Sequence, residues 1–142
     1  MKEQNVKNHQ RYVFSWHILT GLAVIALLIG AIRNVLQSSR ENLYSATLIL
    51  LVALILLSMF WYARAFALKA QDRAIRAEEN LRHFALTGKL LDKRLNMAQI
   101  IALRFAPDEE LPSLAQKTAN ENLSNGAIKK EITNWRSDHH RV

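Results

Sequence analysis

The chain contains no cysteine, only two prolines and only four glycines among its 142 residues. Without cysteine, the protein has no disulfide framework, no thiolate zinc site and no cysteine nucleophile. Proline and glycine interrupt helices most strongly, so their scarcity beside many Ala and Leu residues predicts an all-helical chain. Mean hydropathy is −0.04 because an apolar first half is averaged with a polar second half.

The motifs of several enzyme classes are also missing. The chain has no Gly-rich phosphate-binding loop, no HExxH zinc helix and no nucleophilic Ser framed by Gly. His139 and His140 are adjacent, so in a helix they would point about 100° apart, and we interpret them as structural or solvated. We interpret His83 as a cation near a helix end and the acidic run 108–110 as a helix start. We therefore expect no enzyme, and no catalytic, cofactor-binding or metal-binding residue.

Two windows contain no charged residue, one between Arg11 and Arg33 and the other between Glu41 and Arg64. Each is about 20 residues long, the length that a helix needs to cross the hydrocarbon core of a bilayer. Two buried core helices are the alternative, but the rest of the chain is too short and too polar to wrap them. A secretion signal is disfavoured because a second apolar run follows closely. The predicted segments are an N-terminal tail at 1–11, transmembrane helices at 12–36 and 43–63, and an external loop at 37–42.

Lys and Arg residues gather on the outer flanks of the two windows. Three precede the first window and five lie between residues 64 and 82, whereas the loop between the windows holds only Arg33 and Arg40. Cytoplasmic flanks carry such an excess, which predicts that both termini are cytoplasmic. Aromatic residues at the same ends predict an interfacial belt of Tyr12, Trp16, Trp61 and Tyr62.

The polar side chains inside the windows are few and small. Thr20, Ser45, Thr47 and Ser58 can each bond back to the helix that carries them. Transporters usually carry an ionisable group or a broken helix within the membrane, and neither window has one. We therefore do not expect transport by this chain alone, while a place in a transporter complex stays open.

The stretch after the second window predicts a continuous helix that forms a cytoplasmic stalk at 64–88. Small and apolar residues recur in steps of three and four from Phe60 to Phe84, which favours one face turned toward a partner helix. That partner is a second copy or a later helix of this chain, and Gly88 suits the end of the helix. The alternative is that Ala recurs here only because it is a good helix former, and that the charged residues form a solvated face with no partner helix. The predicted contact seam consists of Ala67, Ala70, Ala74, Ala77, Leu81 and Phe84.

Charges along the stalk support two further interpretations. Acid-first pairs four residues apart, among them Glu78 with Arg82, should stabilise the helix. Arg73, Arg76 and Arg82 would set the register with a partner helix. Basic residues close to the bilayer would contact anionic lipid head groups. Because acidic residues are interleaved with them, we interpret this contact as anchoring and not as regulated recruitment to the membrane. The candidate lipid contacts are Arg64, Lys69, Arg73 and Arg76.

Nucleic-acid binding is the alternative that the net charge of +7 raises. From Arg64 to the C-terminus, 14 Lys or Arg residues are mixed with 10 Asp or Glu residues. A nucleic-acid binder usually clusters its positive charge with exposed aromatic rings, and the tail's tryptophan, Trp135, lies at core spacing. We therefore do not favour nucleic acid as a partner.

The tail at 89–142 predicts a small three-helix cytoplasmic module. Asn96 and Gln99 have the spacing of a capping box and predict the start of a first helix. Pro107 with the acids after it predicts the start of a second helix, and Ser124 predicts the start of a third. With about 50 residues and no disulfide or metal site to cross-link it, the module should be only marginally stable on its own. Its predicted core consists of Ile100, Leu103, Phe105, Leu111, Leu114, Leu123 and Trp135.

Four segments together resemble an uncharacterised family of small bacterial membrane proteins, a domain of unknown function. They are "MKEQNVKNHQRYV", "FALKAQDRAIRAEENLRHF", "IIALRFAPDEELPSLA" and "IKKEITNWRSDHHRV". The resemblance covers nearly the whole chain. It implies a two-span protein of the bacterial inner membrane and supplies no catalytic residue, ligand or reaction.

The combined prediction is a non-enzymatic, multi-pass membrane protein: a transmembrane helical hairpin, a helical stalk with a coiled-coil-like seam, and a small helical module. It would act as an accessory, scaffolding or self-associating subunit. The expected partners are membrane lipids and either itself or another membrane protein, with no cofactor and no small-molecule substrate. The alternative is binding of anionic lipid head groups or nucleic acid by the basic cytoplasmic region.

Overall fold

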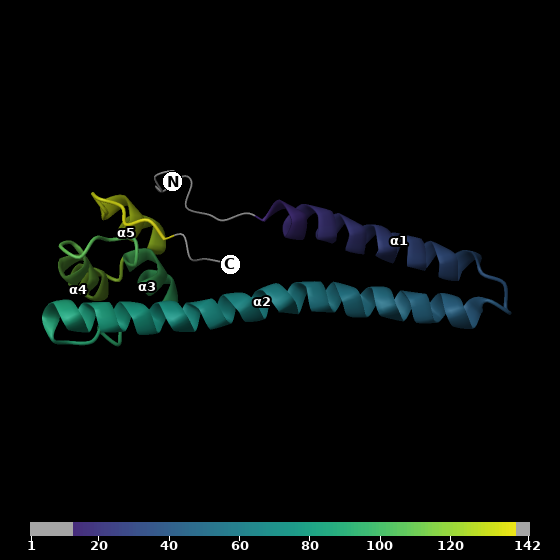
Figure 1. The fold of residues 1–142 in the computed structure, drawn as a ribbon, viewed down its shortest axis with the longest axis horizontal. Coiled ribbons are helices and arrows are strands. Elements are labelled where there is room, and N and C mark those ends of the chain that lie inside the picture. Colours follow the sequence, from purple (N-terminus) through teal and green to yellow (C-terminus); the bar gives the residue numbers. More distant parts are fainter. Residues whose placement is uncertain (1–12, 139–142) are drawn as a thin grey trace. The chain divides into compact units, whose positions relative to one another are not determined.

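The computed structural model describes residues 13–138, and within that range the chain is helical with no strand (Figure 1). This confirms the all-α class. The chain divides into two compact units, whose described parts are residues 13–67 and 68–138. The elements in chain order are the π-helix η1 (Ser15–Thr20) and the α-helices α1 (Gly21–Gln37), α2 (Leu43–Thr87), α3 (Met97–Leu103), α4 (Leu111–Glu121) and α5 (Asn125–Glu131).

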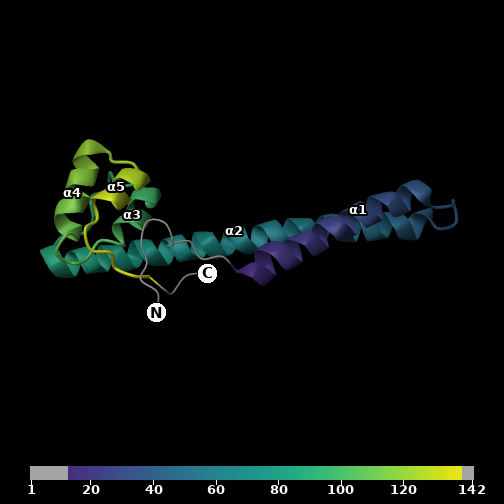
Figure 2. The same ribbon diagram turned by 90° about the horizontal axis from the view of Figure 1, so that it is seen from above.

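In the unit of residues 13–67, α1 lies beside the first part of α2 in both views (Figures 1 and 2). Ala31, Ala46 and Ala53 are buried, and small side chains of this kind let two helices approach closely. The rings of Trp16 and Phe60 stack with their centroids 5.0 Å apart. Small residues and one aromatic stack therefore contribute to the contact within this unit.

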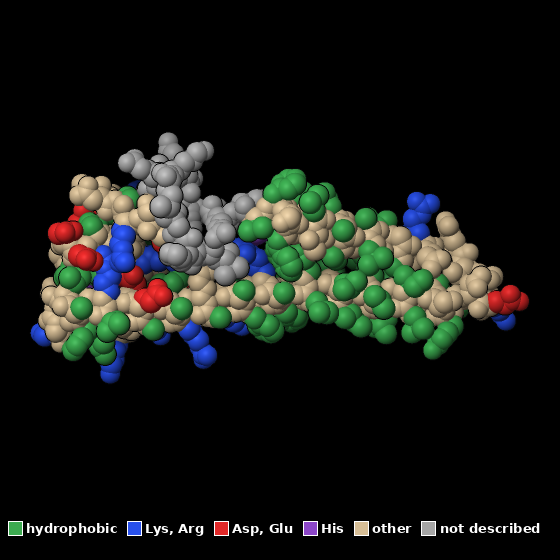
Figure 3. Space-filling model, viewed as in Figure 1, with side chains coloured by type: hydrophobic (Ala, Val, Ile, Leu, Met, Phe, Trp, Pro, Cys, Tyr) green, Lys and Arg blue, Asp and Glu red, His purple; other side chains and the backbone are tan. Residues whose placement is uncertain are grey.

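The two helices of this unit present large apolar side chains outward, which cover much of their visible surface in Figure 3. Helices Ser15–Gln37 and Leu43–Thr87 are both long and apolar enough to cross a membrane, and only 11% of each apolar window is buried. They are therefore unlike the core helices of a soluble protein, which are mostly buried.

The four polar side chains named above within the apolar windows bond back to their own helix, as predicted. The hydroxyl groups of Ser45, Thr47 and Ser58 donate to the carbonyl oxygens three residues earlier, at 3.2, 2.7 and 2.8 Å. The Thr20 hydroxyl donates to the carbonyl five residues earlier, at 3.1 Å, because Ser15–Thr20 forms a π-helix. Nothing in the sequence predicted this wider turn.

Helix α2 runs without a break from Leu43 to Thr87, 45 residues. At 1.5 Å per residue it is about 68 Å long, roughly twice the hydrocarbon thickness of a bilayer. The helix is followed by Gly88, as predicted, where the backbone φ is 72° and the amide donates to the Phe84 carbonyl at 2.7 Å. Glycine suits this position because a positive φ strains residues that have a Cβ atom.

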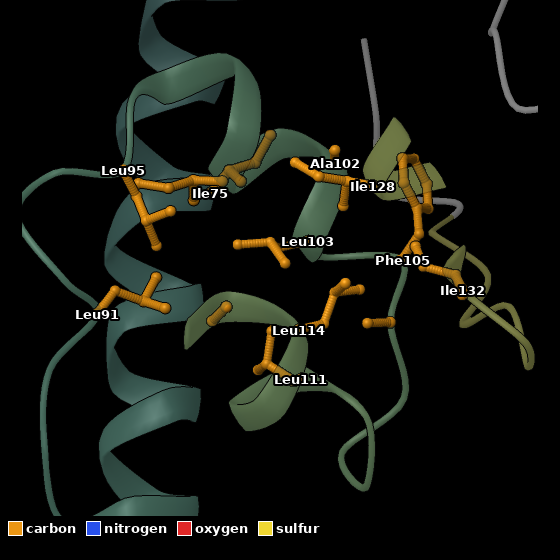
Figure 4. Close-up of a cluster of buried hydrophobic side chains, with 13 residues drawn as sticks. Ile75, Leu91, Leu95, Ala102, Leu103, Phe105, Leu111, Leu114, Ile128 and Ile132 are labelled. Carbon is orange, nitrogen blue, oxygen red and sulfur yellow. The ribbon is translucent and has the colours of Figure 1, made fainter. Parts of the chain in front are cut away.

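In the unit of residues 68–138, α3, α4 and α5 enclose a hydrophobic core with one face of α2 (Figure 4). The seven predicted core residues are confirmed, five of them fully inside and Leu123 and Trp135 partly buried at its edge. The rings of Phe105 and Trp135 stack at 4.8 Å. Core residues outside the predicted set are Ile75, Leu91, Leu95, Ala102, Ala106, Ala115, Ile128 and Ile132.

Two of the three predicted helix starts in the tail are confirmed. Asn96 and Gln99 form the reciprocal capping box of α3, with bonds of 3.0 and 2.8 Å. The Ser124 hydroxyl accepts from the Ala127 amide at the start of α5. The prediction for Pro107 was wrong, because residues 108–110 form a turn and α4 begins at Leu111.

The segment after α5 also differs from the prediction. Ile128, Ile132 and Trp135 occur at helical spacing in the sequence, which predicts a helix that reaches Trp135, but α5 ends at Glu131. The carboxylate of Glu110 accepts from the amides of Thr133 and Asn134 at 3.0 and 3.2 Å, and the Arg136 amide donates to the Phe105 carbonyl at 2.8 Å. These bonds satisfy the backbone outside a helix, so the chain can place Trp135 on the core without continuing α5.

The loop between α2 and α3 is ordered by a local ion pair. The Asp92 carboxylate accepts from the amide of Arg94 at 2.8 Å and from its guanidinium at 2.8 Å, and the guanidinium also donates to Asn120 of α4. Hydrogen bonds to the charged form lower the pKa of Asp92 from 3.8 to about 2.

We predict that the Arg94→Gln substitution raises the pKa of Asp92 back toward 3.8, because the charged hydrogen bonds are lost. Since the folded-state pKa is depressed, the pair stabilises the loop fully above pH 3.8 and ceases to do so as the pH falls through about 2. Carboxyl carbon NMR with labelled Asp would measure the titration. A pKa that is the same in wild type and variant would contradict this assignment.

Candidate functional site

The part of α2 in the second unit has two faces with different surroundings. One face is turned to the tail, where Ile75 and Glu79 are each 6% exposed. At 100° per residue, the opposite face carries Ala70, Ala77 and Phe84, and all three are exposed. The helix is therefore covered by its own tail on one side and uncovered, within residues 68–138, on the other.

The tail-facing side is held by the guanidinium of Arg82, whose side chain is 11% exposed. It donates to the Glu79 carboxylate at 3.0 Å, to the Asp108 carboxylate at 2.6 Å and to the Ala106 carbonyl at 2.7 Å. The side chain of Glu79 is 8% exposed, so each of the two charges is buried only because the other lies beside it. Arg82 therefore ties the turn before α4 to α2.

This arrangement corrects two interpretations of the stalk charges. Arg82 pairs with Glu79, three residues earlier, and with Asp108 across the unit, whereas the sequence suggested Glu78. Its guanidinium is also not presented to an external helix, so Arg82 cannot set the register with a partner as expected. The physical reason is that Arg82 lies seven residues after Ile75 and so shares the core-facing side of the helix.

The predicted contact seam lies on the uncovered side of α2. Ala70, Ala74, Ala77, Leu81 and Phe84 are exposed, and Ala67 is half-buried. Leu81 is 68% exposed and Phe84 51% exposed, which is high for large apolar side chains in an ordered helix. No helix of residues 68–138 covers this face, so the later helices of the described chain are not its partner.

The four candidate lipid contacts do not share one side of the helix. Lys69, Arg73 and Arg76 are exposed and fall within about 60° of one another at 100° per residue. Arg64 is half-buried and points roughly opposite to Arg73 at the same spacing. Three of the four residues therefore form a basic strip along one edge of the seam.

Three of the four residues of the predicted aromatic belt lie in the described part of the chain. Trp61 is 72% exposed, the ring of Tyr62 stacks on Phe66 at 5.5 Å, and Trp16 stacks on Phe60 as described above. Tyr12 lies outside the described residues. Trp16 and Phe60 also line an apolar groove of about 410 Å³ between α1 and α2, together with Leu27 and Leu56.

The two histidines of the described residues, His17 and His83, each bond to a backbone carbonyl. His83 donates from Nδ1 to the Lys89 carbonyl at 2.7 Å, which helps to close the chain after α2. The pair His139 and His140 lies outside the described residues. Among residues 13–138, no three His, Asp or Glu side chains are grouped so that they could hold a metal ion.

Sequence reasoning missed the residues that join α2 to the tail. Ile75 is the only Ile in the charged stretch from residue 64 to residue 88, and Leu68 lies seven residues before it, so a second apolar face was visible in the pattern. The bond from the Leu91 amide to the Asn80 side chain at 3.2 Å, and that from Arg82 to Asp108, had no local signature. They join residues 11 and 26 positions apart.

Over residues 13–138 the fold is all-helical, and its helical stretches Ser15–Gln37 and Leu43–Thr87 are long and apolar enough to cross a membrane. The chain belongs to a family of unknown function, DUF6526, whose model matches residues 1–142. This match confirms the resemblance to an uncharacterised family. No curated protein and no solved structure matches the chain.

We predict that Arg82→Met lowers the opening free energy of α3 to α5 by about 3 kcal/mol, because Glu79 is left as a buried, uncompensated charge. Amide hydrogen exchange of the full chain in detergent micelles would measure it. Asp108→Asn should cost less than about 1 kcal/mol, since that carboxylate is 60% exposed. The double variant Glu79→Leu/Arg82→Met should recover part of the loss. Equal costs for Arg82→Met and Asp108→Asn would contradict the role given to Arg82.

Proposed function

We propose that this is a non-enzymatic integral membrane protein that crosses the bilayer twice and associates with other proteins through its cytoplasmic part. The support for membrane insertion is the pair of apolar helices, in which only 11% of each apolar window is buried, and one of these helices continues after its apolar stretch ends. A bacterial inner membrane is the location that the family resemblance implies. The excess of Lys and Arg outside the two windows supports cytoplasmic termini.

The observation that carries the association is the uncovered seam on α2. An ordered helix with Leu81 and Phe84 exposed on one face, and a folded unit packed on the other, has the form of a docking element. The small side chains of Ala70, Ala74 and Ala77 would let a partner helix approach closely. The protein would then act as an accessory or scaffolding subunit or associate with itself.

Anionic lipid is a second candidate partner, supported by the exposed strip of Lys69, Arg73 and Arg76. These residues follow the apolar stretch of α2 within about four turns, close enough for head-group contact if that stretch spans the bilayer. The strip has two acidic neighbours on the tail-facing side, Asp72, which is half-buried, and Glu79, which pairs with Arg82. Lipid contact would anchor this part of α2 and is compatible with use of the seam.

Charged substitutions on the seam test the association. We predict that Ala70→Glu/Ala77→Glu abolishes the crosslinked species formed in native membranes, because two carboxylates would have to be desolvated in the contact. Crosslinking, purification through a C-terminal tag and mass spectrometry would identify what is lost. The matched control is Ser113→Glu/Gln116→Glu, which adds the same charge at exposed positions of α4. An unchanged crosslinking pattern in the seam variant would contradict the proposal.

Neutral substitutions in the basic strip test the lipid contact. We predict that Lys69→Gln/Arg76→Gln reduces co-purified anionic lipid about 30-fold, at about 1 kcal/mol for each charge near the bilayer surface. Quantitative lipid analysis of the purified protein would measure this ratio. Lys93→Gln/Lys130→Gln, which removes two exposed charges elsewhere in the same unit, should leave the lipid content unchanged. Equal loss in both variants would argue against a specific strip.

A further inference from the structure

The seam on α2 has the pattern of a two-stranded coiled coil. Numbered in heptads, its members alternate between a positions (Ala67, Ala74, Leu81) and d positions (Ala70, Ala77, Phe84). The tail-facing residues Ile75 and Arg82 are then both at b positions, on the far side of the helix. A partner on the seam would therefore leave the packing of α3, α4 and α5 on α2 unchanged.

The residues that flank the seam fit a second copy of the same helix. In a parallel coiled coil, a g residue of one helix faces the e residue five positions later in its partner. Arg73 is at g and Glu78 is at e, five positions apart, and both are exposed. Within residues 13–138 neither takes part in an ion pair. The other flanking residues from 70 to 85 are uncharged, namely Gln71, Asn80 and Ala85.

The same charges disfavour an antiparallel arrangement. When two helices run in opposite directions, g faces g and e faces e, so Arg73 and Glu78 cannot pair across the contact. Two copies inserted in one membrane in the same orientation would also present this part of α2 in parallel. The terminal segments of the chain are poor candidates to cover the seam, since residues 1–12 and 139–142 are mostly polar or charged.

We propose that two copies of this chain pair in parallel and in register along residues 70–84 of α2, with Arg73 of each copy facing Glu78 of the other. This inference rests on the membrane insertion and association proposed above and names the partner. The two ion pairs are related by the two-fold axis of the dimer, so one pair of side chains specifies both flanks of the contact. Ala70, Ala74 and Ala77 bring the helices close, and Leu81 and Phe84 are buried beyond them.

The absence of cysteine from the chain makes the geometry directly testable. Each of the substitutions Ala70→Cys, Ala77→Cys and Phe84→Cys places the sole thiol at a d position. In native membranes under mild oxidation, all three should form disulfide-linked dimers of the full chain on non-reducing gels. The controls Lys69→Cys and Arg76→Cys are exposed c positions on the same helix and should remain monomeric. An antiparallel pair centred on residue 77 would crosslink only the Ala77→Cys variant, and that pattern would overturn the parallel register.

Charge exchange tests the flanking pair. Arg73→Glu and Glu78→Arg should each lower the disulfide yield of Ala77→Cys about fivefold, because each creates two like-charge contacts in the dimer. The variant that carries both substitutions restores opposite charges and should recover the yield. Arg76→Glu, a charge reversal of the same size at a c position, should have little effect. Failure of the double variant to recover the yield would overturn the role of Arg73 and Glu78.

The experiments distinguish failure of the parallel homodimer from failure of the proposed association and membrane insertion. If no cysteine variant crosslinks with itself while Ala70→Glu/Ala77→Glu still removes a crosslinked membrane partner, the seam is a docking face and the homodimer is wrong. If alkaline carbonate extracts the protein from membranes, the proposed insertion is wrong as well. If d-position thiols crosslink and c-position thiols do not, both the surface and its partner are supported.

Discussion

The buried guanidinium of Arg82 is the interaction on which the arrangement of the second unit depends. It makes three hydrogen bonds, one within α2 and two to the turn that leads into α4. Without them, the charge of Glu79 would be buried without compensation and the Ala106 carbonyl would lose its partner. Because the tail has a small core, it gains much of its order from docking on α2 through Ile75 and this charged contact. The charged contact also decides which side of the helix the tail covers.

The division of α2 into sides follows from that choice. Ile75 and Arg82 are turned to the tail, so the seam falls on the opposite side and stays uncovered. The same helix contacts η1 in the first unit, where Phe60 stacks on Trp16. Small and apolar residues recur in steps of three and four from Phe60 to Phe84. The same pattern therefore covers the part of α2 that packs against a helix in the first unit and the part whose seam is uncovered in the described chain. In the account proposed here, a second copy supplies the missing partner.

Local patterns in the sequence predicted most of the helices and some of their ends. The capping box at Asn96, the cap at Ser124 and the glycine at 88 are short-range features, and each appears in the structure. Pro107 failed as a helix start because the acids after it serve tertiary contacts: Asp108 pairs with Arg82 and Glu110 holds the segment after α5. The amino-acid composition of Ser15–Thr20 gave no indication that this segment forms a π-helix. The candidate seam was predictable from periodicity, whereas the side that the tail covers was not, because the bonds that select it join residues far apart in sequence.

The central claim is that both sides of α2 beyond the apolar stretch are occupied in the membrane, one by the tail and the other by a partner helix. A thiol-labelling scan of single-cysteine variants from residue 68 to residue 86 in native membranes would read both sides at once. We predict slow labelling at Ile75 on the tail-facing side, equally slow labelling at Ala70, Ala77 and Phe84 on the seam, and fast labelling at Lys69 and Arg76 between them. Labelling at the seam positions as fast as at Lys69 and Arg76 would contradict it, because the seam would then face solvent.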